Sequence, residues 1–435
     1  MTYEKPVLNI AIAGLGVVGS EVARQLTSRN DALSAACGTR LQLVAVSARS
    51  KDSERGFSMD GIQWVDDARE LAKIEDVDVV IELIGGSDGV ALDLTRASLR
   101  AGKHVITANK AMIAHHGGEL AKLAEDNEVA LTFEAAVAGG IPAVKTLREG
   151  LAANEFTRVA GILNGTCNYI LSRMEKTGEN FDDVLVDAQK LGYAEAEPSF
   201  DVDGIDAAHK LTILAAIAFG HTPHFDAVKI SGIRDVSAVD FAYARQLGFR
   251  IKLVGVAEPG RAPRMEACLL PISSQLAKVD GVLNAVAYDG MPIGSVLSVG
   301  PGAGAGATGS AVLADVIDVA AGRACLPFGR PMAALSDGSK AKNGNGPDTA
   351  FYIRLTVIDQ SGVLADVTKI LQDHDISVES LVQQGRAPDD VVALAMTTHE
   401  CAASALEAAM SALNALSCVK APPVFMPIVP SEQEG

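Results

Sequence analysis

The sequence lacks the features that mark secreted, zinc-binding or membrane-spanning proteins. Its six cysteines are scattered and contain no C-x-x-C pair, which indicates reduced thiols, a cytoplasmic location and no zinc site. The apolar stretch around 211–219 is far shorter than the roughly 20 residues that a membrane-spanning helix needs. The N-terminal residues run straight into a predicted strand and do not have the pattern of a secretory signal.

Basic residues are also scarce. The 37 Lys and Arg residues against 54 Asp and Glu give a net charge of −17, which argues against binding to nucleic acid or to an anionic membrane. A local basic pocket for one small anionic ligand is compatible with this total. With 48% hydrophobic and 21% charged residues the chain is globular, and 435 residues at about 150 per domain suggest about three domains.

The first third of the chain alternates strands with helices. This order predicts an α/β domain over residues 1–138, with a Rossmann-type, doubly wound parallel sheet. Strands are expected at 7–13, 41–46, 77–84, 104–107 and 130–137, and helices at 17–28, 67–73, 90–101 and 111–126.

The remainder of the chain predicts two further domains. Residues 139–301 mix helices and strands, which predicts an α+β domain for substrate binding and dimerisation. Residues 302–322 contain an apolar helix that we expect to complete the first domain, and 323–349 have the composition of a linker. The β-α-β-β-α-β order of 350–430 predicts a small C-terminal domain. Within the middle domain, helices are expected at 141–153, 166–176 and 205–219, and strands at 250–257 and 265–270.

A glycine-rich turn follows the first predicted strand. Gly14, Gly16 and Gly19 fit G-x-G-x-x-G, in which glycines permit a tight turn, backbone approach to a pyrophosphate and close helix packing. Val17 and Val18 open the next helix, whose free N–H groups would face the phosphates. The same glycines could serve packing alone, but their place in a β-α-β pattern favours dinucleotide binding.

The end of the second strand indicates which dinucleotide is bound. An NAD site usually has an acidic residue there, whereas this chain has Arg49 among serines. Because Arg49 could pair with a 2′-phosphate, we predict that NADP is accepted and preferred, with NAD use possible. The alternative is a basic surface loop.

Three charged residues suggest chemistry. Lys110 follows a predicted parallel strand, at the edge of the sheet where ligands bind. Asp206 and Lys210 are spaced i,i+4 and share one helix face, which by itself is typical of a surface salt bridge. Because that helix is apolar nearly all round, it is expected to be buried. Its lysine then needs a polar or charged partner, or a functional role. A lysine beside carboxylates and a cofactor is a plausible proton donor to a carbonyl oxygen.

Together with further motifs, these residues resemble homoserine dehydrogenase over essentially the whole chain. The resemblance implies NAD(P)-linked interconversion of L-homoserine and L-aspartate 4-semialdehyde, a step towards threonine, methionine and isoleucine. Since no aspartate-kinase segment precedes Met1, the monofunctional arrangement is expected. The matching stretches are G-L-G-V-V-G, T-A-N-K, F-E-A-A-V-A-G-G-I-P, N-G-T-C-N-Y-I-L, G-Y-A-E-A-E-P, D-V-D-G-I-D-A-A-H-K and G-P-G-A-G-A-G-A-T-G.

The resemblance also implies roles for individual residues. Lys210 matches the catalytic lysine of the family, and Lys110 matches a second lysine at the junction of cofactor and substrate. Glu195 and Asp206 match substrate-binding acids, and Asp201 lies in the adjoining acidic segment. The resemblance also places Gly304, in the glycine cluster before 310, beside the cofactor; the alternative is a flexible hinge, and the two roles are compatible.

A monovalent cation such as Na⁺ is implied as well. Glu134 matches the family's cation site, together with the backbone carbonyls of Val137, Gly139 and Ile141. Hard oxygen ligands on an irregular turn suit such an ion. From the residues alone, Glu134 could equally be a capping or hinge carboxylate.

The C-terminal unit resembles an ACT domain, an amino-acid-sensing module. The resemblance implies feedback inhibition, with threonine as the expected effector, while the alternative is a dimerisation module without a ligand site. A homodimer or homotetramer is expected, because such modules often self-associate. Two other functions stay open, namely another amino-acid dehydrogenase of the same fold and a catalytically silent amino-acid sensor.

Overall fold

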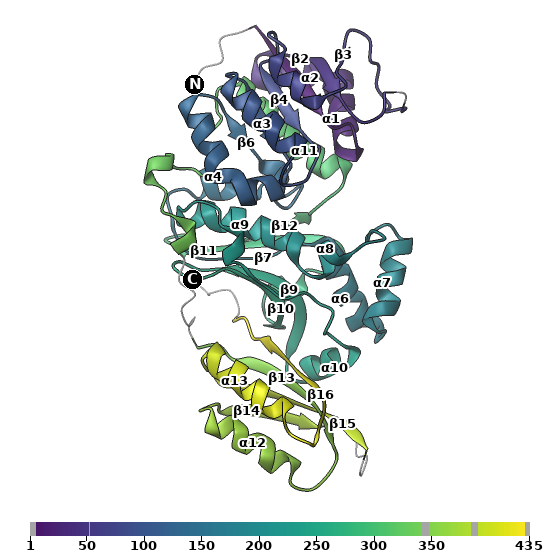
Figure 1. Ribbon diagram of the computed structural model, residues 1–435, viewed down its shortest axis with the longest axis vertical. Helices are drawn as coiled ribbons and strands as arrows, with labels where there is room; N and C mark the ends of the chain where they lie inside the picture. The colour runs from purple at the N-terminus through teal and green to yellow at the C-terminus, as the bar shows by residue number, and fades with distance from the viewer. Residues whose placement is uncertain (1–5, 52, 341–347, 384–389, 431–435) are drawn as a thin grey trace.

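The computed structural model describes residues 6–51, 53–340, 348–383 and 390–430, whose strands form three sheets stacked along the long axis of the molecule (Figure 1). Within these ranges no helix combines the length and the apolar character that a membrane crossing requires.

The first sheet is entirely parallel, with the strand order β3-β2-β1-β4-β5-β6. The order reverses beside β1, so the carboxyl ends of β1 and β4 border a crevice in which ligands bind in folds of this kind. The predicted Rossmann-type sheet is therefore confirmed. Its strands are β1 (Val7–Ala13), β2 (Arg40–Ser47), β3 (Gln63–Trp64), β4 (Val79–Glu82), β5 (His104–Thr107) and β6 (Leu131–Thr132).

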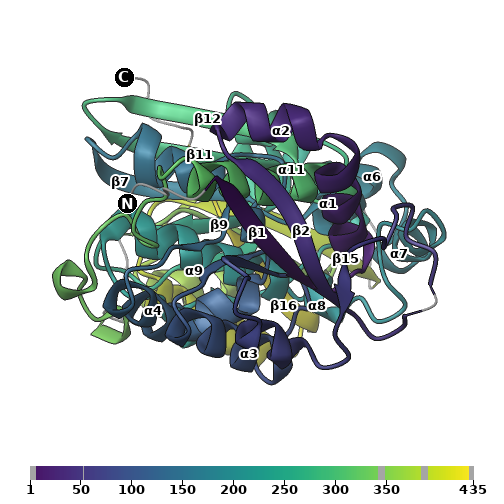
Figure 2. The ribbon, with the colours of Figure 1, turned by 90° about the horizontal axis from the view of Figure 1, so that it is seen from above.

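Helices cover both faces of this sheet (Figure 2). One face carries α1 (Val17–Ser28), α2 (Asn30–Cys37) and α11 (Ala305–Ala320), and the other carries α3 (Val90–Arg100) and α4 (Lys110–Asp126). With both faces covered, residues 11–13 of β1 and 45–47 of β2 are buried without alternation, whereas Arg40 and Gln42 at the start of β2 are exposed. Val312 and Val316 of α11 are fully buried in one cluster with Val22 of α1, so the chain returns to its first domain after passing through the second.

The second sheet has the order β12-β11-β7-β9-β10-β8 and is antiparallel except for the pair β10–β8. Its strands are β7 (Glu155–Ile162), β8 (Lys229–Ile230), β9 (Phe249–Ala257), β10 (Arg264–Pro271), β11 (Leu283–Met291) and β12 (Gly294–Pro301). The apolar α9 (Ile205–Phe219) is buried along nearly its whole length and packs on this sheet beside α6 (Gly165–Thr177). Three further helices complete the domain, α7 (Phe181–Lys190), α8 (Ser199–Val202) and α10 (Ala238–Gln246).

Two predicted elements are wrong near the join of the first two domains. The strand expected at 130–137 ends at Thr132 and gives way to a 3-10 turn, Glu134–Ala136. The helix expected at 141–153 is a short α-turn, Ala143–Lys145, followed by a π-turn, Thr146–Gly150. Ala138 and Gly139 have left-handed φ values of 54° and 52°, which bend the chain between them. Strands β7, β11 and β12 were not predicted. In β11, small residues such as Ala285 and Ala287 weaken the strand pattern.

The C-terminal unit is a four-stranded antiparallel sheet with the order β14-β15-β13-β16 and two helices, which confirms the predicted β-α-β-β-α-β fold. Its elements are β13 (Phe351–Ile358), α12 (Val363–Asp373), β14 (Val378–Gln383), β15 (Val391–Thr398), α13 (Ala403–Asn414) and β16 (Val419–Pro427).

A buried carboxylate docks this unit on the middle domain. Asp240 of α10 is fully buried and accepts hydrogen bonds from Tyr352 Oη at 2.9 Å and Arg354 Nε at 2.7 Å. Its other oxygen caps α10 by accepting from the backbone N–H of Ser237 at 2.8 Å. Beyond the C-terminal unit, Ile428 bridges to Leu269 of β10.

The segment predicted as a linker is packed over much of its described part. Phe328 is buried against Phe133, with ring centroids 5.5 Å apart. Ser336 exchanges backbone hydrogen bonds with the chain around Gly220. Residues 341–347 lie outside the described residues.

Candidate active site

The glycine turn after β1 is built as the motif predicts. Gly14 has a φ of +95°, and a Cβ there would approach Leu83 O to 2.5 Å. A Cβ on Gly19 would collide with Gly14 O, so this glycine lets α1 pack on the turn. Among the described residues, no side chain caps α1 and no atom lies within 4 Å of the position of a Cβ on Gly16. The N-terminus of α1 is therefore open to a phosphate group.

A cavity of about 700 Å³ lies beside this turn. Arg49 lines it, together with Ser47 and Ser50 near the end of β2. Arg55 was not singled out from the sequence, yet it also lines the cavity, with its guanidinium 5.4 Å from the centre of the Trp64 ring. The full lining is Gly14, Leu15, Gly16, Ser47, Ala48, Arg49, Ser50, Arg55, Asp66, Asp67, Ala68, Leu83, Ile84 and Val90.

A second cavity, of about 610 Å³, lies between the first two domains. It brings together seven of the predicted site residues, which come from segments far apart in the sequence. These are Val18, Lys110, Gly139, Asp201, Asp206, Lys210 and Gly304. Val17, at the start of α1, is 76% exposed, which is unusual for a large apolar residue and is consistent with an open ligand crevice.

One carboxylate holds both lysines. Asp206 Oδ2 lies 2.6 Å from Lys210 Nζ, and Asp206 Oδ1 lies 3.1 Å from Lys110 Nζ. Lys210 Nζ also donates to the carbonyl oxygen of Leu163 at 2.8 Å. The i,i+4 pair is therefore a buried ion pair rather than a surface salt bridge, and it reaches across to α4 of the first domain.

The two aspartates of the cavity differ in charge environment. Burial opposes ionisation of Asp206, but the charges of Lys210 and Lys110 outweigh it and hold its pKa well below the usual range. Burial and the charge of Asp206 instead raise the pKa of Asp201. Asn164 donates to both carboxylates, at 2.8 Å to Asp201 and 2.9 Å to Asp206, while its oxygen caps α6 by accepting from Cys167 N–H. Asn164 thus serves the site and the helix end together.

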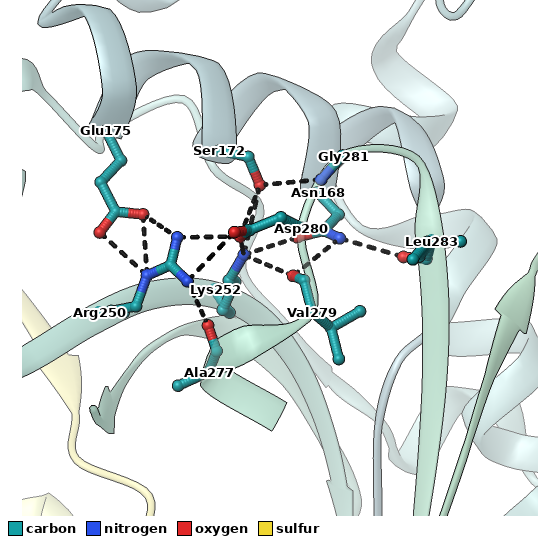
Figure 3. A network of polar contacts seen from close by, with 10 residues as sticks. All are labelled: Asn168, Ser172, Glu175, Arg250, Lys252, Ala277, Val279, Asp280, Gly281 and Leu283. Carbon is teal, nitrogen blue, oxygen red and sulfur yellow. Dashed lines mark hydrogen bonds and ion pairs between the residues drawn. The ribbon is translucent and has the colours of Figure 1, made fainter. Parts of the chain in front are cut away.

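A separate polar network fixes α6 and the loop before β11, both of which contribute to the second cavity (Figure 3). Lys252 of β9 is fully buried and donates to Asn168 Oδ1 at 3.1 Å, Val279 O at 2.6 Å and Asp280 Oδ1 at 2.8 Å. Burial lowers the pKa of Lys252, and the charge of Asp280 opposes that shift. Because its donors are satisfied within the protein, we assign this lysine a structural role.

Glu134 acts as a capping carboxylate. Its Oε1 accepts from Val144 N–H at 3.0 Å and its Oε2 from Lys145 N–H at 2.7 Å, at the start of α5 (Ala143–Lys145). Burial, then the nearby charge of Asp315, raises its pKa to about 7. Val137, Gly139 and Ile141, whose backbone carbonyls are the predicted ligands, lie in or beside the Ala138–Gly139 bend. The cation that the resemblance implies stays a prediction, because both oxygens of Glu134 already accept backbone hydrogen bonds.

One of the predicted substrate-binding acids, Glu195, lies apart from the second cavity. Glu195 is exposed and does not line the second cavity, and its carbonyl oxygen accepts from Gln189 Nε2 at 3.0 Å. Asn284 was not predicted but lines the cavity, and in the described part of the chain both of its buried amide atoms lack a hydrogen-bond partner. Asn284 was missed because it lies in β11, a strand that the sequence did not predict.

Family models match each of the three domains. Residues 14–134 match the model described as homoserine dehydrogenase, NAD binding domain, and residues 142–317 match homoserine dehydrogenase. Residues 351–418 match the ACT domain. A homoserine dehydrogenase of Pseudomonas aeruginosa is 41% identical over 429 residues, covering 97% of this chain and 98% of the relative. This chain belongs to the homoserine dehydrogenase family.

Other relatives agree with this membership. A homoserine dehydrogenase of Neisseria gonorrhoeae is 40% identical, with 96% of this chain and 97% of the relative covered. A crystal structure of a homoserine dehydrogenase from Thiobacillus denitrificans has a TM-score of 0.89 and 38% identity, with 98% of each chain covered. A hyperthermophilic archaeal homoserine dehydrogenase mutant in complex with NADPH has a TM-score of 0.63 and 27% identity, covering 72% of this chain and 97% of that one. The protein is accordingly an oxidoreductase with a nicotinamide-cofactor domain and an ACT domain.

The raised pKa of Glu134 predicts a pH-dependent stability. Its ordinary value is 4.5 and its value in the fold is about 7, so the fold binds this proton more tightly than the unfolded chain does. Its contribution to the free energy of unfolding is complete below pH 4.5 and falls by about 3 kcal/mol as the pH rises through 7. Glu134→Gln should flatten this slope between pH 5 and 8 in denaturant unfolding, whereas the exposed Glu155→Gln should not. Equal pH dependence of the free energy of unfolding in the parent, Glu134→Gln and Glu155→Gln would contradict the raised pKa of Glu134.

Proposed function

We propose that this dehydrogenase interconverts L-aspartate 4-semialdehyde and L-homoserine with NADP, using Lys210 as the proton donor and Lys110 as a second cation at the reacting oxygen. The observation that carries the proposal is the pairing of both lysines with Asp206 on the wall of one cavity. A bound nicotinamide supplies or accepts the hydride there.

The contacts of Lys210 define its role. A lysine ammonium has three N–H donors, and two of them are engaged by Asp206 and by Leu163 O. The third is available to the oxygen of the substrate carbonyl, to which it can deliver a proton as negative charge develops. In the oxidative direction Lys210 must first lose its proton, so oxidation is expected to run faster at raised pH.

The other charged groups of the cavity suit an amino-acid substrate. Asp201 is partly buried and its pKa is raised, so an incoming ammonium would relieve its unfavourable environment. Lys110 is 31% exposed and offers its remaining donors to the substrate. Glu195 is proposed as a further acid for the ammonium, on the strength of the family resemblance.

Removal of Lys210 tests the chemical step. Lys210→Met should lower kcat for homoserine oxidation by about 10² to 10⁴, because the proton acceptor is lost while Lys110 still pairs with Asp206. NADP affinity, measured by fluorescence titration, should change little, because Gly14, Arg49 and their neighbours form a separate cavity. Lys122→Met, which removes an exposed lysine of α4, is the matched control. Near-normal turnover in folded Lys210→Met would exclude the proposed role.

The lining of the first cavity supports the preference for NADP. Arg49 and Arg55 offer two guanidinium groups for a 2′-phosphate, and Ser47 and Ser50 offer hydroxyl donors. Asp66 and Asp67 also line the cavity, but Asp66 accepts from Trp64 Nε1 and Asp67 pairs with Arg69.

Arg49→Ala should raise KM for NADP by about 10- to 100-fold, the loss expected for a hydrogen bond to a charged group. KM for NAD should stay within about twofold, since NAD carries no 2′-phosphate. Arg29→Ala, at the opposite end of α1, serves as the control. Equal effects on the two cofactors would contradict the assignment of Arg49 to the phosphate.

We propose further that the ACT domain binds threonine and inhibits the enzyme. Its first strand-to-helix turn, 359–362, ends at Gly362, which has a φ of +99° and opens α12. Such a helix start offers free N–H groups to a carboxylate. Self-association as a homodimer or homotetramer is proposed with it.

Threonine inhibition is tested on the full chain. Initial rates of homoserine oxidation should fall with rising L-threonine and stay constant with D-threonine, because a specific amino-acid site distinguishes the two enantiomers. Isothermal titration calorimetry with L-threonine should give saturable binding at the same concentrations. If neither rate nor heat responds to L-threonine, the ACT domain has only a structural role.

A further inference from the structure

Four aromatic rings pack together next to Lys110. They are called here the ring column and consist of Phe200 of α8, His209 of α9, Phe225 of the 3-10 turn Phe225–Ala227, and His115 of α4. His209 lies parallel to Phe225, with centroids 4.2 Å apart and an angle of 10°, and Phe200 stacks on His209 at 5.6 Å and 27°. His115 contacts Phe225 at 4.8 Å between centroids.

The ring column meets Lys110 through its two ends. The ring of Phe200 faces Lys110 Nζ at 5.8 Å from its centre, within the range of a cation–π contact. At the other end, Nε2 of His115 lies 3.2 Å from Nε2 of His209, and His115 is on the same helix as Lys110. The contacts therefore lead from Lys110 through Phe200, His209 and Phe225 to His115, which lies on the same helix as Lys110.

One end of the ring column is exposed and its middle is buried. Phe200 is 43% exposed, although large apolar side chains are usually buried. His209 is only 4% exposed, and burial, followed by the charges of His115 and Lys110, lowers its pKa to about 4. It is therefore uncharged at neutral pH and does not repel the ammonium of Lys110.

We infer that the ring column is a positioning device for Lys110, which holds its ammonium at the cavity wall through Phe200 while Asp206 holds it from the other side. This inference rests on the proposed role of Lys110 in the reaction. A lysine side chain has four rotatable bonds, and one ion pair leaves much of that freedom. A second contact, on the ring face, restricts the ammonium to one place. Phe200, His209 and His115 are therefore positioning residues, acting through Lys110.

The kinetic test compares two substitutions of the exposed ring. Phe200→Leu should lower kcat for homoserine oxidation about tenfold, with KM for NADP within twofold of the parent, because only the placement of Lys110 changes. Phe200→Tyr keeps the ring face and should retain most of the activity. His116→Gln, on α4 but outside the column, should match the parent.

A double-substitution cycle separates positioning from a general loss of structure. In a Lys110→Met background, Phe200→Leu and His209→Leu should each change kcat by less than twofold, since the group they position is gone. Multiplicative losses in the two backgrounds, or parent-like kcat in Phe200→Leu and His209→Leu, would overturn the inference. Parent-like kcat in Lys110→Met alone would instead overturn the proposed role of Lys110, and the column would then have no catalytic group to position.

Discussion

The geometry of the active site depends on one buried carboxylate. Asp206 would be costly to bury alone, and it is stable because Lys210 and Lys110 each occupy one of its oxygens. Lys210 belongs to the same helix, but Lys110 belongs to the first domain. The ion pair between Lys110 and Asp206 therefore joins the first domain to the middle domain, so the docking of the two domains and the geometry of the second cavity cannot be separated.

The return of α11 to the first domain reinforces this join. Its Asp315 is fully buried and accepts from the backbone N–H of Glu134, and Lys145 pairs with Asp315 at 3.1 Å. Glu134 in turn caps the turn at Ala143–Lys145. Gly304, at the start of α11, and Val18, in α1, line the same cavity. Helix α11 is thereby held against the middle domain by buried charges.

Local patterns in the sequence were sufficient for the features that depend on neighbouring residues. The glycine turn, the first strand and helix, and the shared face of Asp206 and Lys210 follow from spacing within a few residues. The contact of Lys110 with Asp206 joins two domains, and no local pattern contains it. The same holds for Arg55, whose place in the first cavity depends on the path of a loop. Asn284 lies in a strand of small residues, which the sequence does not distinguish from other apolar segments.

The contact between Ile428 and Leu269 has a consequence for the order of synthesis. Ile428 follows the ACT domain in the chain, yet it pairs with Leu269 of β10 in the middle domain, where the neighbouring Val429 is also buried. The chain therefore returns to the middle domain after the ACT domain, through this bridge beside β10. A ribosome must produce the whole ACT domain before β10 can acquire these contacts, so the middle domain gains them only after the ACT domain has been synthesised.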